Sequence, residues 1–124
     1  MRNIISYKNR SPEIDQSSYI NFHSMIIGKV IINSNCSVWP GAILCAFERE
    51  ILILDEVVIL DKSVLTATDN NSVEIGERAL ISQCSTLQGC KIGKNVLVGR
   101  GANICEGAIV GEGAIINTSN RIDC

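Results

Sequence analysis

Aromatic residues, charged runs and long apolar runs are all scarce in this chain of 124 residues. Five residues are aromatic, and the formal net charge of -2 arises from scattered side chains of both signs. No stretch of Lys and Arg is long enough to follow a phosphate backbone or an anionic lipid surface, so neither nucleic acid nor a membrane is expected as a partner. The longest apolar run, "AILCAF" at 42–47, is far shorter than the roughly 20 residues that a membrane-spanning helix needs.

The sequence also lacks a secretory leader and the cysteine pairs of a structural zinc site. The N-terminal segment "MRNIISYKNRSPEID" lacks the apolar core of a secretory leader, which favours a cytoplasmic protein. The six cysteines contain no CxxC pair with zinc-finger spacing, so they are expected to be free thiols. Cys36 and Cys90 are predicted to act as small core residues.

Aliphatic β-branched residues are abundant instead. The chain contains 20 Ile and nine Val, and 46% of its residues are hydrophobic. This composition favours one all-β domain whose core consists of thin stacked layers.

The β-branched and other aliphatic residues recur with a period of six. The register comprises Ile32, Val38, Leu44, Ile53, Ile59, Leu65, Ile75, Ile81, Leu87, Ile92, Val98, Ile104, Val110 and Ile116. Two residues before each of them stands a second inward position, which is Val, Ala, Ser or Cys in all but one case. An alternating pair of inward residues describes a short strand, and three such hexads close one triangular coil. The sequence therefore predicts a left-handed parallel β-helix of about five coils.

The register also predicts the organisation of the chain. Residues 1–18 are interpreted as an N-terminal strap or tail, residues 19–117 as the β-helix domain with an irregular first coil, and residues 118–124 as a short polar tail. The segments "CAFEREI" (45–51) and "TATDNNSV" (66–73) each insert residues at one corner. Loops that leave a solenoid at one corner are a common place for function.

Three motifs within the repeat are more specific than the repeat itself. They read "SVWPGAIL" at 37–44, "LQGCKIG" at 87–93 and "NVLVGRGANI" at 95–104. Through them, residues 26–116 resemble the gamma-class carbonic anhydrase family and its relatives. The resemblance implies a homotrimer and a zinc or similar ion held by three histidines, two from one subunit and one from its neighbour. The C-terminal helix of that family has no counterpart here, so the last coil is expected to be open or covered by a partner.

The resemblance also implies that the zinc ligands of the family are replaced in this chain. It places the three ligand positions on Thr66, Gln83 and Gln88, none of which is histidine. Zinc prefers thiolate, imidazole and carboxylate over a neutral amide or hydroxyl. No cofactor is therefore expected, zinc is predicted to be absent, and no catalytic residue is assigned.

The positions around these ligands have changed as well. The family's Arg-Gly-Asp becomes Cys45-Ala46-Phe47, a glutamine becomes Leu60, and only Asp61 of this group is retained. Trp39 and Phe47 are the apolar residues expected at the subunit interface.

Two classes of function remain open. The first is a non-catalytic trimeric scaffold or a module that binds an unknown small molecule or protein, with Gln83 and Gln88 as polar interface residues. The second is an enzyme: either a hexapeptide acyltransferase that uses His23, the only histidine, as its base, or a carbonic-anhydrase-like protein with a metal site rebuilt around Cys45 or Cys105.

Overall fold

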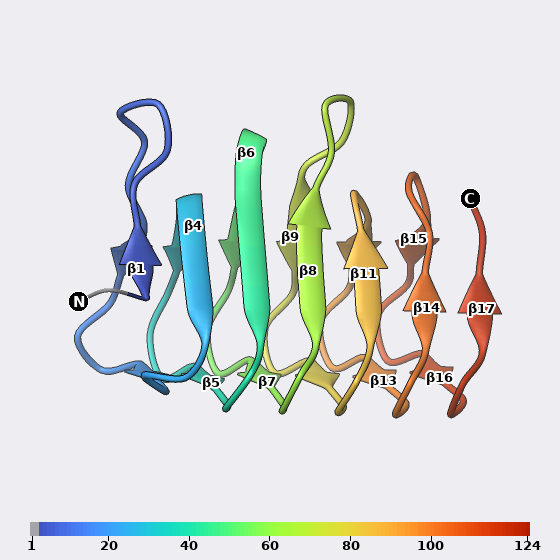
Figure 1. Ribbon diagram of the computed structural model, residues 1–124. Coiled ribbons are helices and arrows are strands. Elements are labelled where there is room, and N and C mark those ends of the chain that lie inside the picture. Colours follow the sequence, from blue (N-terminus) through green and yellow to red (C-terminus); the bar gives the residue numbers. More distant parts are fainter. Residues whose placement is uncertain (1–2) are drawn as a thin grey trace.

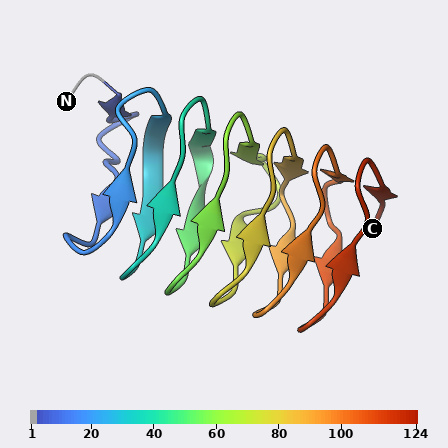
Figure 2. The same ribbon diagram turned by 90° about the horizontal axis from the view of Figure 1, so that it is seen from below.

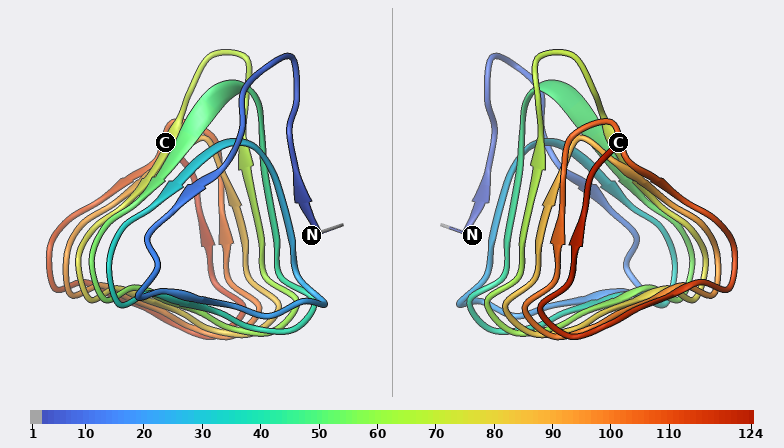
Figure 3. Two further views of the ribbon diagram at one scale, coloured as in Figure 1. Left: turned by 90° about the vertical axis from the view of Figure 1, so that its left-hand side faces the viewer. Right: turned by 90° about the vertical axis from the view of Figure 1, so that its right-hand side faces the viewer.

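The chain winds into a left-handed parallel β-helix, as the sequence predicts (Figure 1). The computed structural model describes residues 3–124, which form an all-β solenoid of about seven turns. Seen along its axis, the solenoid has a triangular outline (Figure 3). No helix occurs among residues 3–124, so none of the described segments is a helix long and apolar enough to span a membrane.

Three walls of parallel strands form the sides of this triangle. Wall 1 contains β2 (Glu13–Ile14), the C-terminal parts of β4 (Met25–Ile32) and β6 (Ile43–Ile53), β9 (Val73–Ile75), β12 (Lys91–Ile92) and β15 (Ile109–Val110). Wall 2, which Figure 2 shows from below, contains β3 (Tyr19–Ile20), β5 (Ser37–Val38), β7 (Val58–Ile59), β10 (Leu80–Ile81), β13 (Leu97–Val98) and β16 (Ile115–Ile116). Wall 3 contains β1 (Ile4–Ile5), the N-terminal parts of β4 and β6, β8 (Val64–Ala67), β11 (Thr86–Gln88), β14 (Asn103–Ile104) and β17 (Arg121–Ile122).

The repeated aliphatic residues form the core that the register predicts. All 14 of them are buried, and the wall-1 stack of Ile53, Ile75, Ile92 and Val110 pairs in register with no member more than 6% exposed. Of the small inward residues two positions earlier, only Ala114 is not fully buried. Large and small side chains alternate inward along each short strand, and this alternation fills the narrow interior.

The prediction of about five coils is too low because the register extends further at both ends. Ile14, Ile20 and Ile26 precede Ile32 in steps of six and pair with inward residues of the next turn. At the other end, Ile122 follows Ile116 by six residues and pairs with Ile104. Residues 4–5 and 13–14 thus add β1 and β2 to the solenoid, on either side of a loop that contains Pro12.

The corner between walls 2 and 3, here called the tight corner, is made of four-residue turns. These turns are 21–24, 39–42, 60–63, 82–85, 99–102 and 117–120. The third residue of several turns has a left-handed backbone, with φ of 62° at Lys62, 61° at Cys84 and 71° at Gly101. The repetition keeps successive turns stacked in register.

The corner between walls 3 and 1 is lengthened in three turns, through residues 6–12, 47–50 and 68–72, and is called the extended corner. Between β4 and β6 the register jumps: Gly28 pairs with Ala46, whereas Val30 pairs with Ile51. Lys29 alone therefore lies opposite residues 47–50, which project outward. Gly28 has a φ of 80°, and a Cβ atom at this position would overlap the carbonyl oxygen of Ala46. Close approach of the two backbones thus requires glycine here.

Candidate functional site

The three residues that the resemblance places at zinc-ligand positions lie at opposite ends of wall 3. At the end next to the extended corner, Cys45 pairs with Thr66 and Thr66 pairs with Gln88, so these three residues form one column across three turns. Cys45 and Thr66 are half-buried, whereas Gln88 is exposed. The side chains in this column are a thiol, a hydroxyl and an amide.

Gln83 lies at the other end of wall 3, in the tight corner. It stacks below Asp61, because the N–H of Cys84 donates to the Asp61 carbonyl (3.0 Å) and the N–H of Gly101 donates to the Gln83 carbonyl (2.9 Å). Leu60 precedes Asp61 in the same turn and is half-buried. Residues 83–85 belong to the turn and residues 86–88 to β11, so the turn and the strand separate Gln83 from the side chain of Gln88. One copy of the chain does not bring these two amides together.

The two cysteines considered for a rebuilt metal site have environments that favour the neutral thiol. Burial raises the pKa of Cys45. A hydrogen bond to Asp123 raises the pKa of Cys105, with desolvation as the second cause. Cys36 and Cys90 are in the core as expected, and burial raises the pKa of Cys90 to about 12. None of the six cysteines forms a disulfide within residues 3–124.

The remaining candidate residues are scattered over the surface. His23 is exposed in the first tight-corner turn, where its ring centroid lies 4.1 Å from that of Phe22. Trp39 is 41% exposed and contacts the Tyr19 ring edge-on, with 6.1 Å between centroids. Phe47 is 39% exposed and lies at the extended corner. In the part of the chain that the structure describes, no group of three His, Cys, Asp or Glu is close enough to hold a metal ion.

The extended corner is held together by contacts between successive turns. Tyr7 contacts Phe47 edge-on with 4.8 Å between ring centroids, and Lys8 Nζ lies 3.1 Å from Glu48 Oε1. One turn further, Arg49 Nε donates to the carbonyl oxygen of Asp69 at 3.0 Å. The three lengthened segments therefore pack on one another along one edge of the solenoid (Figure 3).

A carboxylate from a lower turn holds the last of these segments. Glu106 Oε2 accepts hydrogen bonds from Thr68 Oγ1 (2.6 Å) and Asn71 Nδ2 (2.9 Å). These bonds stabilise the charged form and lower the pKa of Glu106. The 68–72 segment is therefore fixed at both sides, by Arg49 from above and by Glu106 from below.

Sequence reasoning locates two of the three lengthened segments but misses the basic residues they gather, Arg10, Lys29 and Arg49. The segments 45–51 and 66–73 break the six-residue step and are visible for that reason. Arg10 comes from a segment interpreted as a strap or tail, and its contact with Glu48 spans 38 residues. No periodic signal in the sequence links these positions.

Comparisons with proteins of known structure agree on the fold. The structure of a hexapeptide transferase family protein from Anaplasma phagocytophilum superposes with a TM-score of 0.86 at 26% identity, covering 99% of this chain and 76% of that one. A putative acetyltransferase from Bacillus cereus superposes with a TM-score of 0.65 at 25% identity, covering 97% and 73%. The acetyltransferase domain of PglB from Neisseria gonorrhoeae shares the fold at 14% identity, with a TM-score of 0.76 and coverage of 91% and 54%. These structural neighbours are thus hexapeptide-repeat proteins of the transferase type.

Comparisons by sequence do not identify the family of the chain. No protein-family profile matches the chain. An uncharacterized protein of Dictyostelium discoideum is 28% identical over 83 residues, which is 63% of this chain. The matched part spans 34% of the length of that protein.

Proposed function

We propose that this chain is a gamma-carbonic-anhydrase-like hexapeptide-repeat protein that has lost its zinc site and acts in the cytoplasm as a non-catalytic trimeric scaffold or binding module. One observation carries this proposal. Thr66 and Gln88, two of the three positions where the resemblance expects imidazole ligands, pair in register with each other and with Cys45, and all three side chains are neutral. A zinc ion held by amide and hydroxyl oxygens would bind weakly and would not acidify a bound water.

The trimer is part of the same proposal. Gln83 and Gln88 lie at opposite ends of wall 3, so one copy's tight corner must meet the next copy's extended-corner end for the two positions to converge. A head-to-tail contact closes into a ring of three when it rotates each copy by about 120°, which is the geometry that the proposed trimer requires. The outer face of wall 3 supports it, because its outward positions carry no charge over five successive turns: Met25, Ile27, Ile43, Cys45, Val64, Thr66, Thr86, Gln88, Asn103 and Cys105.

The test is the zinc content and the carbon dioxide hydration rate of protein purified without added metal. The proposal expects neither stoichiometric zinc nor hydration above the buffer rate. Zinc at one ion per subunit together with measurable hydration would show that the site has been rebuilt instead.

Acyl transfer is a second candidate, favoured by the neighbours described as a hexapeptide transferase family protein and a putative acetyltransferase. His23 is exposed and is the only imidazole available as a base. Its backbone N–H is fixed by Asn21 Oδ1 at 2.8 Å. Acetyl-coenzyme A that broadens the His23 ring resonances and is hydrolysed or transferred would favour this candidate, whereas absence of both effects leaves the non-catalytic function.

A further inference from the structure

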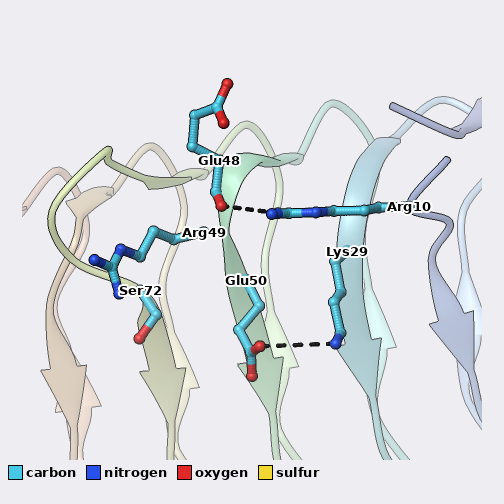
Figure 4. A pocket seen from close by; sticks show the side chains of 6 residues that line it. All are labelled: Arg10, Lys29, Glu48, Arg49, Glu50 and Ser72. Carbon is cyan, nitrogen blue, oxygen red and sulfur yellow. Dashed lines mark hydrogen bonds and ion pairs between the residues drawn. The ribbon is translucent and has the colours of Figure 1, made fainter. Parts of the chain in front are cut away.

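The extended corner contains a surface cavity that is separate from the column of Cys45, Thr66 and Gln88. Its volume is about 380 Å³, which is at the lower end of the range for small-molecule sites. Six residues from four different turns line it: Arg10, Lys29, Glu48, Arg49, Glu50 and Ser72 (Figure 4).

Two guanidinium groups at this cavity are positioned by backbone carbonyls. Arg10 Nη1 donates to the carbonyl oxygen of Glu48 at 2.8 Å, and Arg49 Nε donates to that of Asp69 at 3.0 Å. Within residues 3–124, neither guanidinium has a carboxylate within 4.0 Å. Their geometry is therefore set while their charge is not neutralised by a neighbouring acid.

The two acidic residues at the cavity do not cancel this charge. The carboxylate of Glu48 is held by Lys8 at 3.1 Å and points away from the other lining residues (Figure 4). Glu50 lies between Lys29 on one side and Arg49 with Ser72 on the other, and its closest contact to Lys29 Nζ is 3.9 Å. Three cationic side chains thus line the cavity together with one carboxylate, that of Glu50, which lies nearest to Lys29.

We propose that this cavity binds the phosphate group of a small molecule. The free terminal nitrogens of Arg49 form a planar fork that matches two oxygens of a phosphate, and Lys29 supplies a second charge. The Ser72 hydroxyl is a neutral donor at the same wall of the cavity. Arg10, Lys29 and Arg49 carry three positive charges against the one negative charge of Glu50. A ligand group with two negative charges is therefore favoured over a single carboxylate.

Titration with inorganic phosphate at constant ionic strength tests the proposal. The readout is the NMR shift of the arginine Nε–Hε resonances, and glycerol phosphate is titrated in parallel. Saturable shifts at Arg10 and Arg49 are expected with both. Tighter binding of the ester identifies an organic phosphate as the ligand, and equal binding identifies free phosphate.

Matched variants separate a site from general attraction to basic residues. Arg49→Gln is expected to weaken binding about tenfold, because one charge-assisted pair is removed. Arg49→Lys keeps the charge, loses the fork and should weaken binding less. Arg100→Gln removes an exposed arginine at the tight corner and should change nothing.

Glu50→Gln provides the sharpest outcome, since it removes the carboxylate that lies nearest to Lys29. Phosphate affinity should rise severalfold, which loss of a purely structural residue would not produce. The proposal is overturned if phosphate causes no saturable shift, if Arg100→Gln weakens binding as much as Arg49→Gln, or if Glu50→Gln weakens it. None of these results depends on zinc or hydration, so the outcome is independent of the function proposed above.

Discussion

The two corners that bound wall 3 differ in how they are built. The tight corner repeats one four-residue turn from coil to coil, and it carries Asp61 and Gln83 without gathering charges of one sign. The extended corner departs from the repeat in three turns and brings together basic side chains from segments far apart in sequence. In the two proposals made above, assembly uses the regular part of the solenoid and binding belongs where the repeat is interrupted.

A substitution in the core that both corners share should cause the largest loss of stability. Ile81 is fully buried on wall 2, and Ile81→Asp would place a charge among aliphatic residues with no partner. We expect a loss of more than about 4 kcal/mol, enough to prevent folding. Circular dichroism measures this, and Ser82→Asp, one residue along and outward, is the control. A folded Ile81→Asp protein would contradict the register that defines both corners.

Substitution of two glycines by alanine compares the extended corner, at Gly28, with an ordinary turn, at Gly113. Gly28→Ala must place its Cβ atom against the Ala46 carbonyl at a left-handed φ, so it should cost about 3 kcal/mol. Gly113 has a similar φ of 75°, but no atom lies within 4 Å of the place that a Cβ atom would take, so Gly113→Ala should cost only about 1 kcal/mol. Urea unfolding of the two variants measures the difference. Equal losses would mean that β4 and β6 do not approach closely at the register jump.

The smallest effect is a pH dependence confined to the 68–72 segment. Hydrogen bonds from Thr68 and Asn71 lower the pKa of Glu106 below its ordinary value of 4.5. A group with a lowered folded pKa contributes stability above its unfolded pKa and loses it as pH falls through the folded value. The amide resonance of Asn71 should therefore shift in acid, below pH 4.5, and not near neutrality.

Glu106→Ala should abolish that shift and increase hydrogen exchange at Thr68, whose N–H bonds to the Asn71 carbonyl. Glu112→Ala removes an exposed glutamate that pairs with Lys94 at 4.0 Å and serves as the matched control. If the Asn71 amide resonance still shifts in acid in the Glu106→Ala variant, another group than Glu106 causes that shift.

The regular coils of the solenoid can be predicted from the sequence, whereas the extended corner can be predicted only in part. Inward positions follow from a period of six, so the burial of Ile53, Ile75 and Ile92 is predictable from residue identity alone. The same period also runs through Ile14 and Ile122, and the predicted coil count is low because it treats these flanks as tails. Contacts such as Arg10 with Glu48 follow no period, since they arise where the chain leaves the repeat.

The candidate site also has a part that the sequence predicts and a part that it does not. The stacking of Thr66 and Gln88 follows from the register, because both come directly after an inward leucine. Which corner turns enclose a cavity depends on loop conformations set by contacts such as Arg49 with Asp69 and Glu106 with Asn71. Those contacts join residues 20 and 35 positions apart, and nothing in the local sequence specifies them.

Native mass spectrometry in the presence of zinc tests the central claim most directly. The unmodified protein is compared with a variant that carries Thr66→His, Gln83→His and Gln88→His. The account predicts zinc-free trimers for the unmodified protein and zinc-loaded trimers for the variant, because the three imidazoles converge only between neighbouring copies. Stoichiometric zinc on the unmodified protein, or zinc bound to monomers of the variant, would contradict it.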